Sequence, residues 1–147
     1  MTRPSIELRE VTASNWRAVA SVVPRADQRQ FVADTTYYMC LAHYGDDWTS
    51  LAIVADEQII GHVMWAYDDE EKSFWLGGLV IDEKEQGKGY GRASVDTFMA
   101  RFAPDPGDRV ALSYQPENQL ARRLYQSLGF VETGETEDDE IVARFRR

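Results

Sequence analysis

One segment, Leu79 to Arg92, constrains the fold of this chain more than any other. It reads LVIDEKEQGKGYGR, so an apolar run leads through alternating glycines into a helical pattern with the stripe Val95, Phe98, Met99 and Phe102. The first turn of such a helix has N–H groups without carbonyl partners and a partial positive charge. Glycines let an anion approach these amides closely. The segment therefore predicts a buried strand, a glycine-rich turn and a helix whose entrance binds an anionic group.

The rest of the chain alternates between strand and helix patterns. Predicted strands cover residues 5–10, 49–55, 58–67, 74–81, 110–114, 130–133 and 141–145, and predicted helices cover 14–23, 28–44, 92–102 and 118–128. This order favours a mixed α/β sandwich over a doubly wound sheet. Gly77-Gly78 inside the fourth strand predicts a bulge or a close backbone approach, or else only a weak strand. The acidic run Glu135 to Glu140 lies between the last two strands and indicates a hairpin turn.

Length and charge limit the domain count and the partners. The 147 residues, 44% of them hydrophobic, suit one domain spanning 1–147. The formal net charge of −9 opposes general binding to nucleic acid or anionic membranes. The acidic surface either attracts a cationic ligand or only keeps the protein soluble.

Targeting and metal-binding signals are missing from the sequence. No apolar run approaches the roughly 20 residues needed to span a bilayer, and no signal peptide follows Met1, so we expect a cytoplasmic protein without membrane attachment. The single cysteine, Cys40, cannot form an internal disulfide. Neither Cys40 nor the isolated His43 and His62 has neighbours at metal-ligand spacing, so we predict no metal site.

The glycine spacing separates the loop from two common phosphate-binding motifs. A Walker loop needs four residues between its glycines and then Gly-Lys-Ser/Thr, and a dinucleotide fingerprint needs Gly-x-Gly-x-x-Gly. Here Gly87, Gly89 and Gly91 alternate, while Lys88 and Arg92 add positive charge. The pattern Gln86-x-x-Gly89-x-Gly91 instead resembles the pyrophosphate motif of the GNAT acetyltransferase superfamily, Gln/Arg-x-x-Gly-x-Gly/Ala.

A second signature supports this resemblance. The run PENQLARRLYQSLGF, residues 116–130, is similar to the family pattern Asn-x-x-Ala-x-x-Leu-Tyr-x-x-x-Gly-Phe, with Asn118, Leu124, Tyr125 and Gly129 in place. Both signatures occur in the family's order, and the first follows the fourth predicted strand. Within the superfamily, residues 74–91, 112–130 and 140–144 look most like the bacterial spermine/spermidine acetyltransferases.

The resemblance implies a fold, a co-substrate and site residues. The GNAT fold has a mixed sheet of about six to seven strands and about four helices, with strands four and five splayed apart. Acetyl-CoA would be the acetyl donor, Tyr125 the general acid for the leaving thiolate, and the protein a homodimer. The cofactor-binding residues would be Leu79, Val80 and Ile81 through their backbone, the loop residues Gln86, Gly87, Lys88, Gly89, Tyr90, Gly91 and Arg92, and Asn118, which could equally cap a helix.

The acceptor side carries more open questions. Many GNAT enzymes place a glutamate base on the fourth strand, but alignment on Gln86 puts Trp75 near that position, so water or desolvation of the amine would serve instead. An alkylammonium is held by carboxylates and aromatic faces. The candidate substrate-binding residues are Asp34, Tyr37, Tyr38, Trp75 and Asp82. The acidic clusters Asp68–Glu71 and Glu135–Glu140 are interpreted as solvated turns.

These features predict N-acetylation of a primary amine on a cationic small molecule, a polyamine or diamine. Two alternatives remain open from the sequence. One is a resistance enzyme that acetylates an amine-bearing antibiotic by the same chemistry. The other is a non-catalytic acyl-CoA sensor, which Trp75 at the expected base position keeps under consideration.

Overall fold

One mixed sheet organises the computed structural model, which describes residues 4–146. Its strands are β1 (Glu7–Glu10), β2 (Thr49–Ala55), β3 (Gln58–Asp68), β4 (Ser73–Ile81), β5 (Val110–Tyr114), β6 (Phe130–Glu137) and β7 (Glu140–Phe145). The helices are α1 (Trp16–Ala20), α2 (Thr35–Tyr44), α3 (Tyr90–Phe102) and α4 (Gln119–Ser127), with 3₁₀ turns η1 (Ala26–Gln28) and η2 (Glu83–Glu85). The strand order is β1-β2-β3-β4-β5-β7-β6, and every described pair except β4–β5 is antiparallel.

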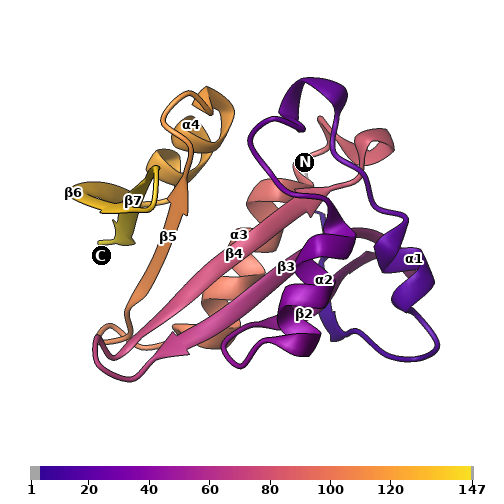
Figure 1. The fold of residues 1–147 in the computed structure, drawn as a ribbon, viewed down its shortest axis with the longest axis horizontal. Helices are drawn as coiled ribbons and strands as arrows, with labels where there is room; N and C mark the ends of the chain where they lie inside the picture. The colour runs from indigo at the N-terminus through magenta and orange to yellow at the C-terminus, as the bar shows by residue number, and fades with distance from the viewer. Residues whose placement is uncertain (1–3, 147) are drawn as a thin grey trace.

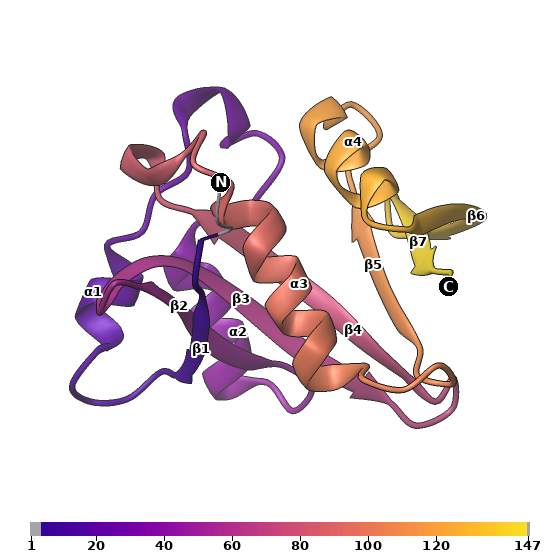
Figure 2. The same cartoon turned by 180° about the vertical axis from the view of Figure 1, so that it is seen from behind.

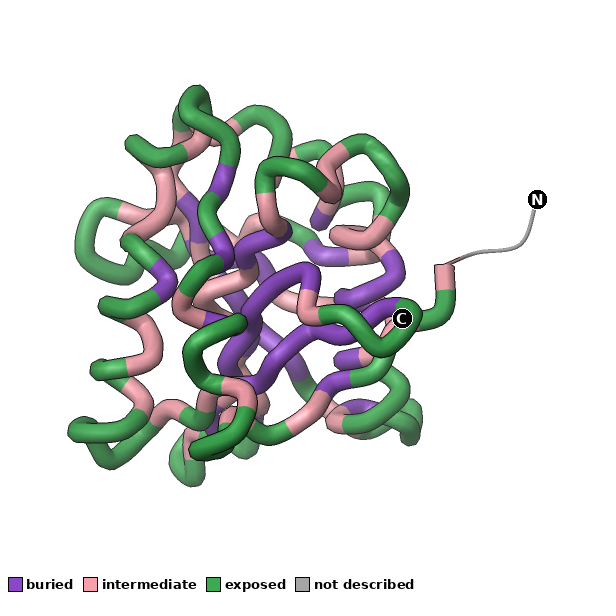
Figure 3. The backbone as a smooth tube through the Cα atoms, turned by 90° about the vertical axis from the view of Figure 1, so that its right-hand side faces the viewer, coloured by how far each residue is buried: buried purple, intermediate pink, exposed green. Residues whose placement is uncertain are grey.

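Helices cover both faces of the sheet. Figure 1 shows α1 and α2 on the near face, and the reverse view in Figure 2 shows α3 lying across the other face with α4 beside it. The main core lies under α3, where Val95 and Phe98 pack on strand residues such as Leu51 and Leu112. A smaller apolar cluster around Val19 and Ala52 lies under α1 and α2. Buried positions gather in the central strands (Figure 3). The predicted α/β sandwich of seven strands and four helices is confirmed.

Strands β4 and β5 are paired only at one end. Their register contains Phe74↔Val110 and Trp75↔Ala111, after which the strands separate. In Figure 1 they meet near the lower left turn and diverge upward, so that β5, β6, β7 and α4 stand apart from the rest of the sheet. The separation coincides with a bulge in β4, where His62↔Val80 and Met64↔Gly77 bracket one extra residue on β4. The prediction of splayed fourth and fifth strands is confirmed.

Several predicted boundaries and faces differ from the structure. Of the predicted helix at residues 28–44, only α2 (Thr35–Tyr44) is an α-helix, since η1 ends at Gln28 and residues 29–34 are not helical, and α3 begins at Tyr90 rather than Arg92. The side chain of Asn15, at the N-cap position of α1, accepts a hydrogen bond from the Thr12 amide and does not cap the helix. The apolar periodicity of residues 14–23 and 118–128 predicts Trp16 and Leu120 on stripes facing the core, but the two side chains are 42% and 52% exposed.

Candidate active site

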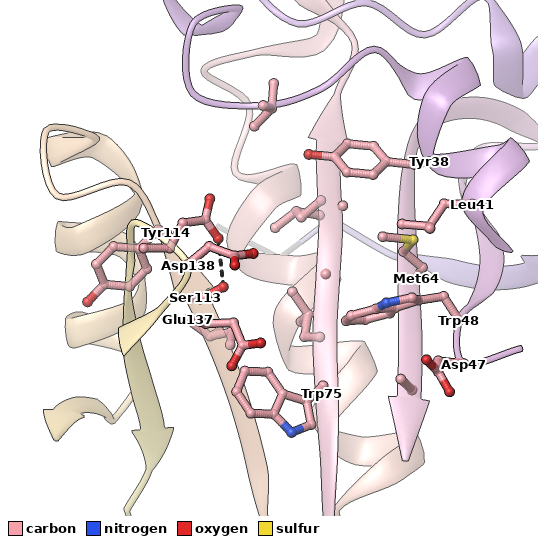
Figure 4. Close-up of a pocket in the computed structure, with 18 of the residues that line it drawn as sticks. Tyr38, Leu41, Asp47, Trp48, Met64, Trp75, Ser113, Tyr114, Glu137 and Asp138 are labelled. Atoms are coloured by element: carbon pink, nitrogen blue, oxygen red, sulfur yellow. Dashed lines mark hydrogen bonds between the residues drawn. The ribbon is translucent and has the colours of Figure 1, made fainter. Parts of the chain in front are cut away.

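A cleft of about 1020 Å³ opens where β4 and β5 separate. One wall comes from α2 and the neighbouring Asp47-Trp48, the other from β5, α4 and the β6–β7 turn, and the floor from β3 and β4. Figure 4 shows Tyr38, Leu41 and Trp48 facing Tyr114, Glu137 and Asp138 across this opening. The cleft therefore joins residues that lie about a hundred positions apart in the chain.

The bulge of β4 forms the middle of the floor and depends on two glycines. Gly78 has φ +55°, a conformation that favours glycine, and a Cβ there would lie 3.1 Å from the Tyr38 ring. A Cβ at Gly77 would lie 2.8 Å from the ring of Trp48. The predicted bulge is confirmed, because β4 carries one extra residue here and Gly78 has a positive φ, whereas the close contacts at both glycines come from side chains and not from another backbone.

His62 lies beneath this floor and is fully buried. Its Nδ1 donates to the carbonyl oxygen of Gly78 at 2.8 Å, and its Nε2 accepts from the hydroxyl of Ser50 at 2.9 Å. The ring of Tyr38 stacks on the imidazole with centroids 5.8 Å apart. Burial lowers the pKa of His62 from 6.5 to about 4, an effect that its hydrogen bond to Gly78 only partly offsets. The imidazole is therefore neutral at pH 7.

The lowered pKa of His62 predicts a loss of stability in mild acid. Between pH 6.5 and about 4, the unfolded chain binds a proton at this imidazole and the folded protein does not, so the free energy of unfolding falls as pH falls. The contribution is on the order of 3 kcal/mol across that range. We expect urea unfolding at pH 7 and pH 4.5 to show a smaller pH-dependent loss for His62→Gln than for wild type. Equal losses in the two proteins would contradict this prediction.

Tyr125 closes the cleft from the α4 side. Its ring stacks on Tyr114 with centroids 5.9 Å apart, and Phe130 packs against it at 5.8 Å. Tyr114 is held in turn by donating its hydroxyl to Glu132 at 3.1 Å. Burial raises the pKa of Tyr125, with smaller contributions from the phenols of Tyr38 and Tyr114. The Tyr125 hydroxyl thus stays protonated and can act as a hydrogen-bond donor inside the cleft.

The glycine-rich loop takes the geometry that its sequence predicts. Gly87 and Gly89 have φ +78° and +83°, and Gly89 is the N-cap residue of α3. The first hydrogen bond of α3 runs from the Ala93 N–H to the Gly89 carbonyl. The amides of the preceding turn therefore lack helical carbonyl partners. A Cβ at Gly87 would meet nothing within 4 Å, so the space above the loop is open to a ligand.

Polar side chains of the same loop hold it in place. Gln86 donates to the carbonyl of Ile81 at 2.7 Å, which ties the loop to the end of β4. Lys88 forms an ion pair with Glu85 at 2.8 Å. Arg92 donates to the hydroxyl of Ser127, linking α3 to α4. The loop is thus fixed between the two helices beside the open end of the sheet.

The structure separates the predicted acceptor-site residues into two groups. Tyr37, Tyr38 and Trp75, three of the candidate substrate-binding residues, line the cleft. Asp34 is exposed at the N-cap of α2 and does not line the cleft. Asp82 lies outside it too, because its carboxylate accepts from the backbone amides of Val23 and Lys84. Asp82 caps η2, and this local role explains its position before the loop.

Asn118 serves as a helix cap and also lines the cleft. Its side-chain oxygen accepts from the amide of Ala121 at 3.2 Å, at the N-cap of α4. Of the two roles considered for this residue, the cap is the one that the structure displays. The cap places the start of α4, and with it Tyr125 two turns later, against the cleft.

The acidic clusters are the part of the site that sequence reasoning missed. Both were interpreted as solvated turns, but the β3–β4 and β6–β7 turns lie on the rim of the same cleft. Together with Asp47 they contribute nine carboxylates to its lining: Asp47, Asp68, Asp69, Glu70, Glu71, Glu137, Asp138, Asp139 and Glu140. No Lys, Arg or His from the described part of the chain, residues 4–146, lines the cleft. The local sequences show two ordinary polar turns, and only the pairing of β5 with β7 brings them together.

One of these carboxylates, that of Glu71, is neutralised by an ion pair with an arginine. Glu71 pairs with Arg144 at 3.0 Å and accepts from the indole nitrogen of Trp75 at 3.1 Å. Arg144 also pairs with Glu135 at 2.8 Å, and its guanidinium lies 5.7 Å from the centre of the Trp75 ring. This network fixes the Trp75 indole at the floor. Among residues 4–146, the other acidic rim residues form no ion pair within 4.0 Å, so negative charge gathers at this rim of the cleft.

Two negative observations complete the site. Among residues 4–146, no group of three or more His, Cys, Asp or Glu side chains is arranged to hold a metal ion. None of the described helices is long and apolar enough to cross a bilayer.

Solved structures with the same architecture define the class of protein. An acetyltransferase of the GNAT family from Bacillus anthracis superposes with a TM-score of 0.73 at 16% identity, covering 99% of this chain and 96% of that one. The PaiA N-acetyltransferase of Thermoplasma acidophilum, solved in complex with coenzyme A, has a TM-score of 0.67 at 13% identity, covering 97% and 99%. A sheet that opens between two parallel strands beside a glycine-lined helix entrance is thus the GNAT fold.

Sequence comparison establishes the family. Residues 8–130 match the model of the acetyltransferase (GNAT) family, so the chain belongs to that family and is an acetyl-CoA-dependent N-acetyltransferase. The spermine/spermidine N(1)-acetyltransferase of Bacillus subtilis (strain 168) is 29% identical over 143 residues, covering 89% of this chain and 91% of that protein. The predicted resemblance to the bacterial spermine/spermidine acetyltransferases is confirmed.

Proposed function

We propose that this enzyme transfers the acetyl group of acetyl-CoA to a primary amine of a polyamine or diamine, by direct attack on the thioester. The observation that carries the proposal is the acidic rim of the cleft, whose lining within residues 4–146 contains nine carboxylates, one of them paired with Arg144, and no cationic side chain. A polyamine carries several positive charges along a flexible chain and complements such a surface. The name of the Bacillus subtilis relative supports the same substrate class.

The glycine loop and the end of β4 fit the coenzyme. In this proposal the diphosphate binds the amides of the loop, residues 86–92, because Gly87 and Gly89 turn the backbone into a nest beside a helix entrance. Backbone groups of Leu79, Val80 and Ile81 pair with the pantetheine arm and polarise the thioester carbonyl. When bound, acetyl-CoA supplies an acetyl group activated as a thioester. Asn118 acts through its cap of α4 rather than through a side-chain donor.

The two ends of the amine substrate need different surroundings. A primary alkylamine has a pKa near 10.4, so releasing its proton at pH 7 costs about 4 to 5 kcal/mol. Carboxylates raise the pKa of a nearby amine, whereas an apolar environment lowers it. We place the distal ammonium groups at the acidic rim and the reacting amine against the deeper apolar floor, where Met64, Leu76 and Leu112 line the cleft. Water between floor and rim accepts the proton.

Aromatic residues connect these two zones. Trp48 and Trp75 line the cleft on opposite sides of β4 in Figure 4, and Tyr37 is 60% exposed at the α2 edge. An alkylammonium gains roughly 0.5–2 kcal/mol from each well-placed aromatic face. Trp75 occupies the place where many family members carry a glutamate, so in this chain that position contributes a ring face in place of a base.

A charge-neutralising variant of the rim tests the substrate class. Asp138→Asn with Asp139→Asn removes two negative charges from the β6–β7 turn, and we expect the KM for spermidine to rise about three- to thirty-fold. The effect should grow at low ionic strength, because salt screens the rim. Steady-state kinetics with spermidine, spermine, a diamine and a monoamine measures it. The monoamine should respond least, since it places no second charge at the rim.

The β2–β3 turn offers a matched control. Asp56→Asn with Glu57→Gln also removes two negative charges from a tight turn, at a site outside the cleft. This control should leave all KM values within about twofold. Equal effects of the two double variants would reject recognition by the rim. An enzyme that binds acetyl-CoA but acetylates no amine in the panel would reject the proposed function and favour a sensor.

A further inference from the structure

We propose that His62 is a positioning residue for catalysis: its hydrogen bond to Gly78 sets the orientation of the Gly78–Leu79 peptide in the β4 bulge. The inference extends the proposed function, in which the Leu79 amide is one of the groups that polarise the thioester carbonyl. His62 touches neither substrate, because it is fully buried beneath the floor of the cleft.

The bulge leaves one peptide of β4 without its regular partner. The ladder with β3 passes from Met64↔Gly77 to His62↔Val80, so residues 78 and 79 have no Cα partners on β3. The Gly78 carbonyl accepts from the His62 imidazole instead, at 2.8 Å. In a trans peptide the C=O and the following N–H point in opposite directions. Holding the Gly78 carbonyl toward His62 therefore points the Leu79 N–H away from it.

Glycine makes this bulge possible and also leaves its backbone conformation poorly fixed. Gly78 adopts φ +55° readily because it has no Cβ, but for the same reason other conformations of similar energy are accessible to it. A single hydrogen bond from a rigid donor can select one of them. Gly78 and Leu79 both line the cleft, so the orientation of the peptide between them determines which backbone group faces the cleft.

Three contacts make the imidazole a rigid donor. Ser50 donates to Nε2 at 2.9 Å, which leaves the ring proton on Nδ1, facing Gly78. The Tyr38 ring stacks on the imidazole with an interplanar angle of 8° and also covers Gly78, from α2. The ring can neither rotate nor exchange its tautomer without breaking one of these contacts. It acts through the bulge and not as a proton acceptor for the amine.

Two amide variants of equal polarity separate this role from packing. In His62→Asn the side-chain NH₂ reaches the place of Nδ1 and can still donate to Gly78, whereas in His62→Gln it lies near the place of Nε2. We expect His62→Gln to lower kcat about ten- to a hundred-fold, with both KM values within about threefold of wild type. His62→Asn should retain kcat within about threefold. The other histidine, His43, is exposed, and His43→Gln serves as the matched control.

Two spectroscopic measurements test the inference without turnover. In the apo protein, ¹⁵N NMR of the imidazoles should show the His62 proton on Nδ1, coupled through a hydrogen bond to the Gly78 carbonyl. With a ¹³C-carbonyl ketone analogue of acetyl-CoA, the carbonyl resonance should be deshielded in wild type and His62→Asn and not in His62→Gln. Neither readout requires acetylation of an amine, so failure of the proposed function can be distinguished from failure of this inference. A proton on Nε2, or equal kcat and carbonyl shifts in the Asn and Gln variants, would overturn the role of His62.

Discussion

Tyr125→Phe should lower kcat by about a hundred-fold or more while leaving acetyl-CoA affinity almost unchanged. The substitution removes only a hydroxyl, and the stacking of the ring on Tyr114 and Phe130 persists. Burial keeps the pKa of this phenol raised, so the hydroxyl is a proton-bearing group at every pH at which the enzyme works. A well-placed acid or hydrogen-bond donor to a departing thiolate is worth roughly two to four orders of magnitude in rate.

The measurement is a kcat comparison combined with calorimetric titration of acetyl-CoA. Tyr44→Phe is the matched control, because Tyr44 is 82% exposed and does not line the cleft. Thermal melts of both variants should stay close to wild type. If Tyr125→Phe turned over at the wild-type rate, the cleft would have to supply another donor, and Tyr125 would be only a packing residue.

Gly89→Asp should weaken acetyl-CoA binding by about a hundred-fold or more. The new carboxylate would lie at the N-cap of α3, where the loop amides would otherwise face the diphosphate. Two like charges about 4 Å apart at a protein surface repel by about 4 kcal/mol, which exceeds the 2.7 kcal/mol of a hundred-fold change. Among residues 4–146, only Pro4 lies within 4 Å of a Cβ there, so the side chain meets little crowding and its cost to the fold comes from the positive φ of +83°.

Two comparisons isolate the charge from the backbone effect. Gly134→Asp adds the same side chain at a similar positive φ of +88°, at an uncrowded position in the irregular part of β6, and it should leave binding unchanged. Gly89→Asn keeps the shape without the charge and should weaken binding far less than Gly89→Asp. Normal acetyl-CoA affinity of a well-folded Gly89→Asp protein would contradict the assignment of the loop.

Local sequence patterns were sufficient to predict most strands of the sheet and the glycine-rich turn at the start of α3. The strand Val110–Tyr114 agrees with its predicted bounds, because β-branched and apolar residues between turn signals have few alternatives to a buried strand. Gly87, Gly89 and Gly78 were informative for a related reason. Positive φ is uncommon for most other residues, so a glycine in a turn or bulge pattern favours such a backbone conformation.

Side-chain exposure was less predictable from periodicity. Trp16 and Leu120 continue apolar stripes, yet both side chains remain exposed in the folded chain. The position of Asp82 just before the glycine-rich loop made it a candidate substrate ligand. Its carboxylate instead accepts hydrogen bonds from the backbone amides of Val23 and Lys84. Partners that lie 59 positions away along the chain cannot be read from a local pattern.

The amino-acid sequence by itself determined the glycine nest, the order of strands and helices and the family signatures, since all of these depend on short-range backbone preference. Only the tertiary structure decided that two acidic turns, near residues 70 and 138, face one cleft, and that His62 lies beneath Gly78. The physical reason is that strand pairing and the bulge in β4 fix which distant residues meet. Charge and hydrogen bonding act through space, so their consequences appear only once those pairings are made.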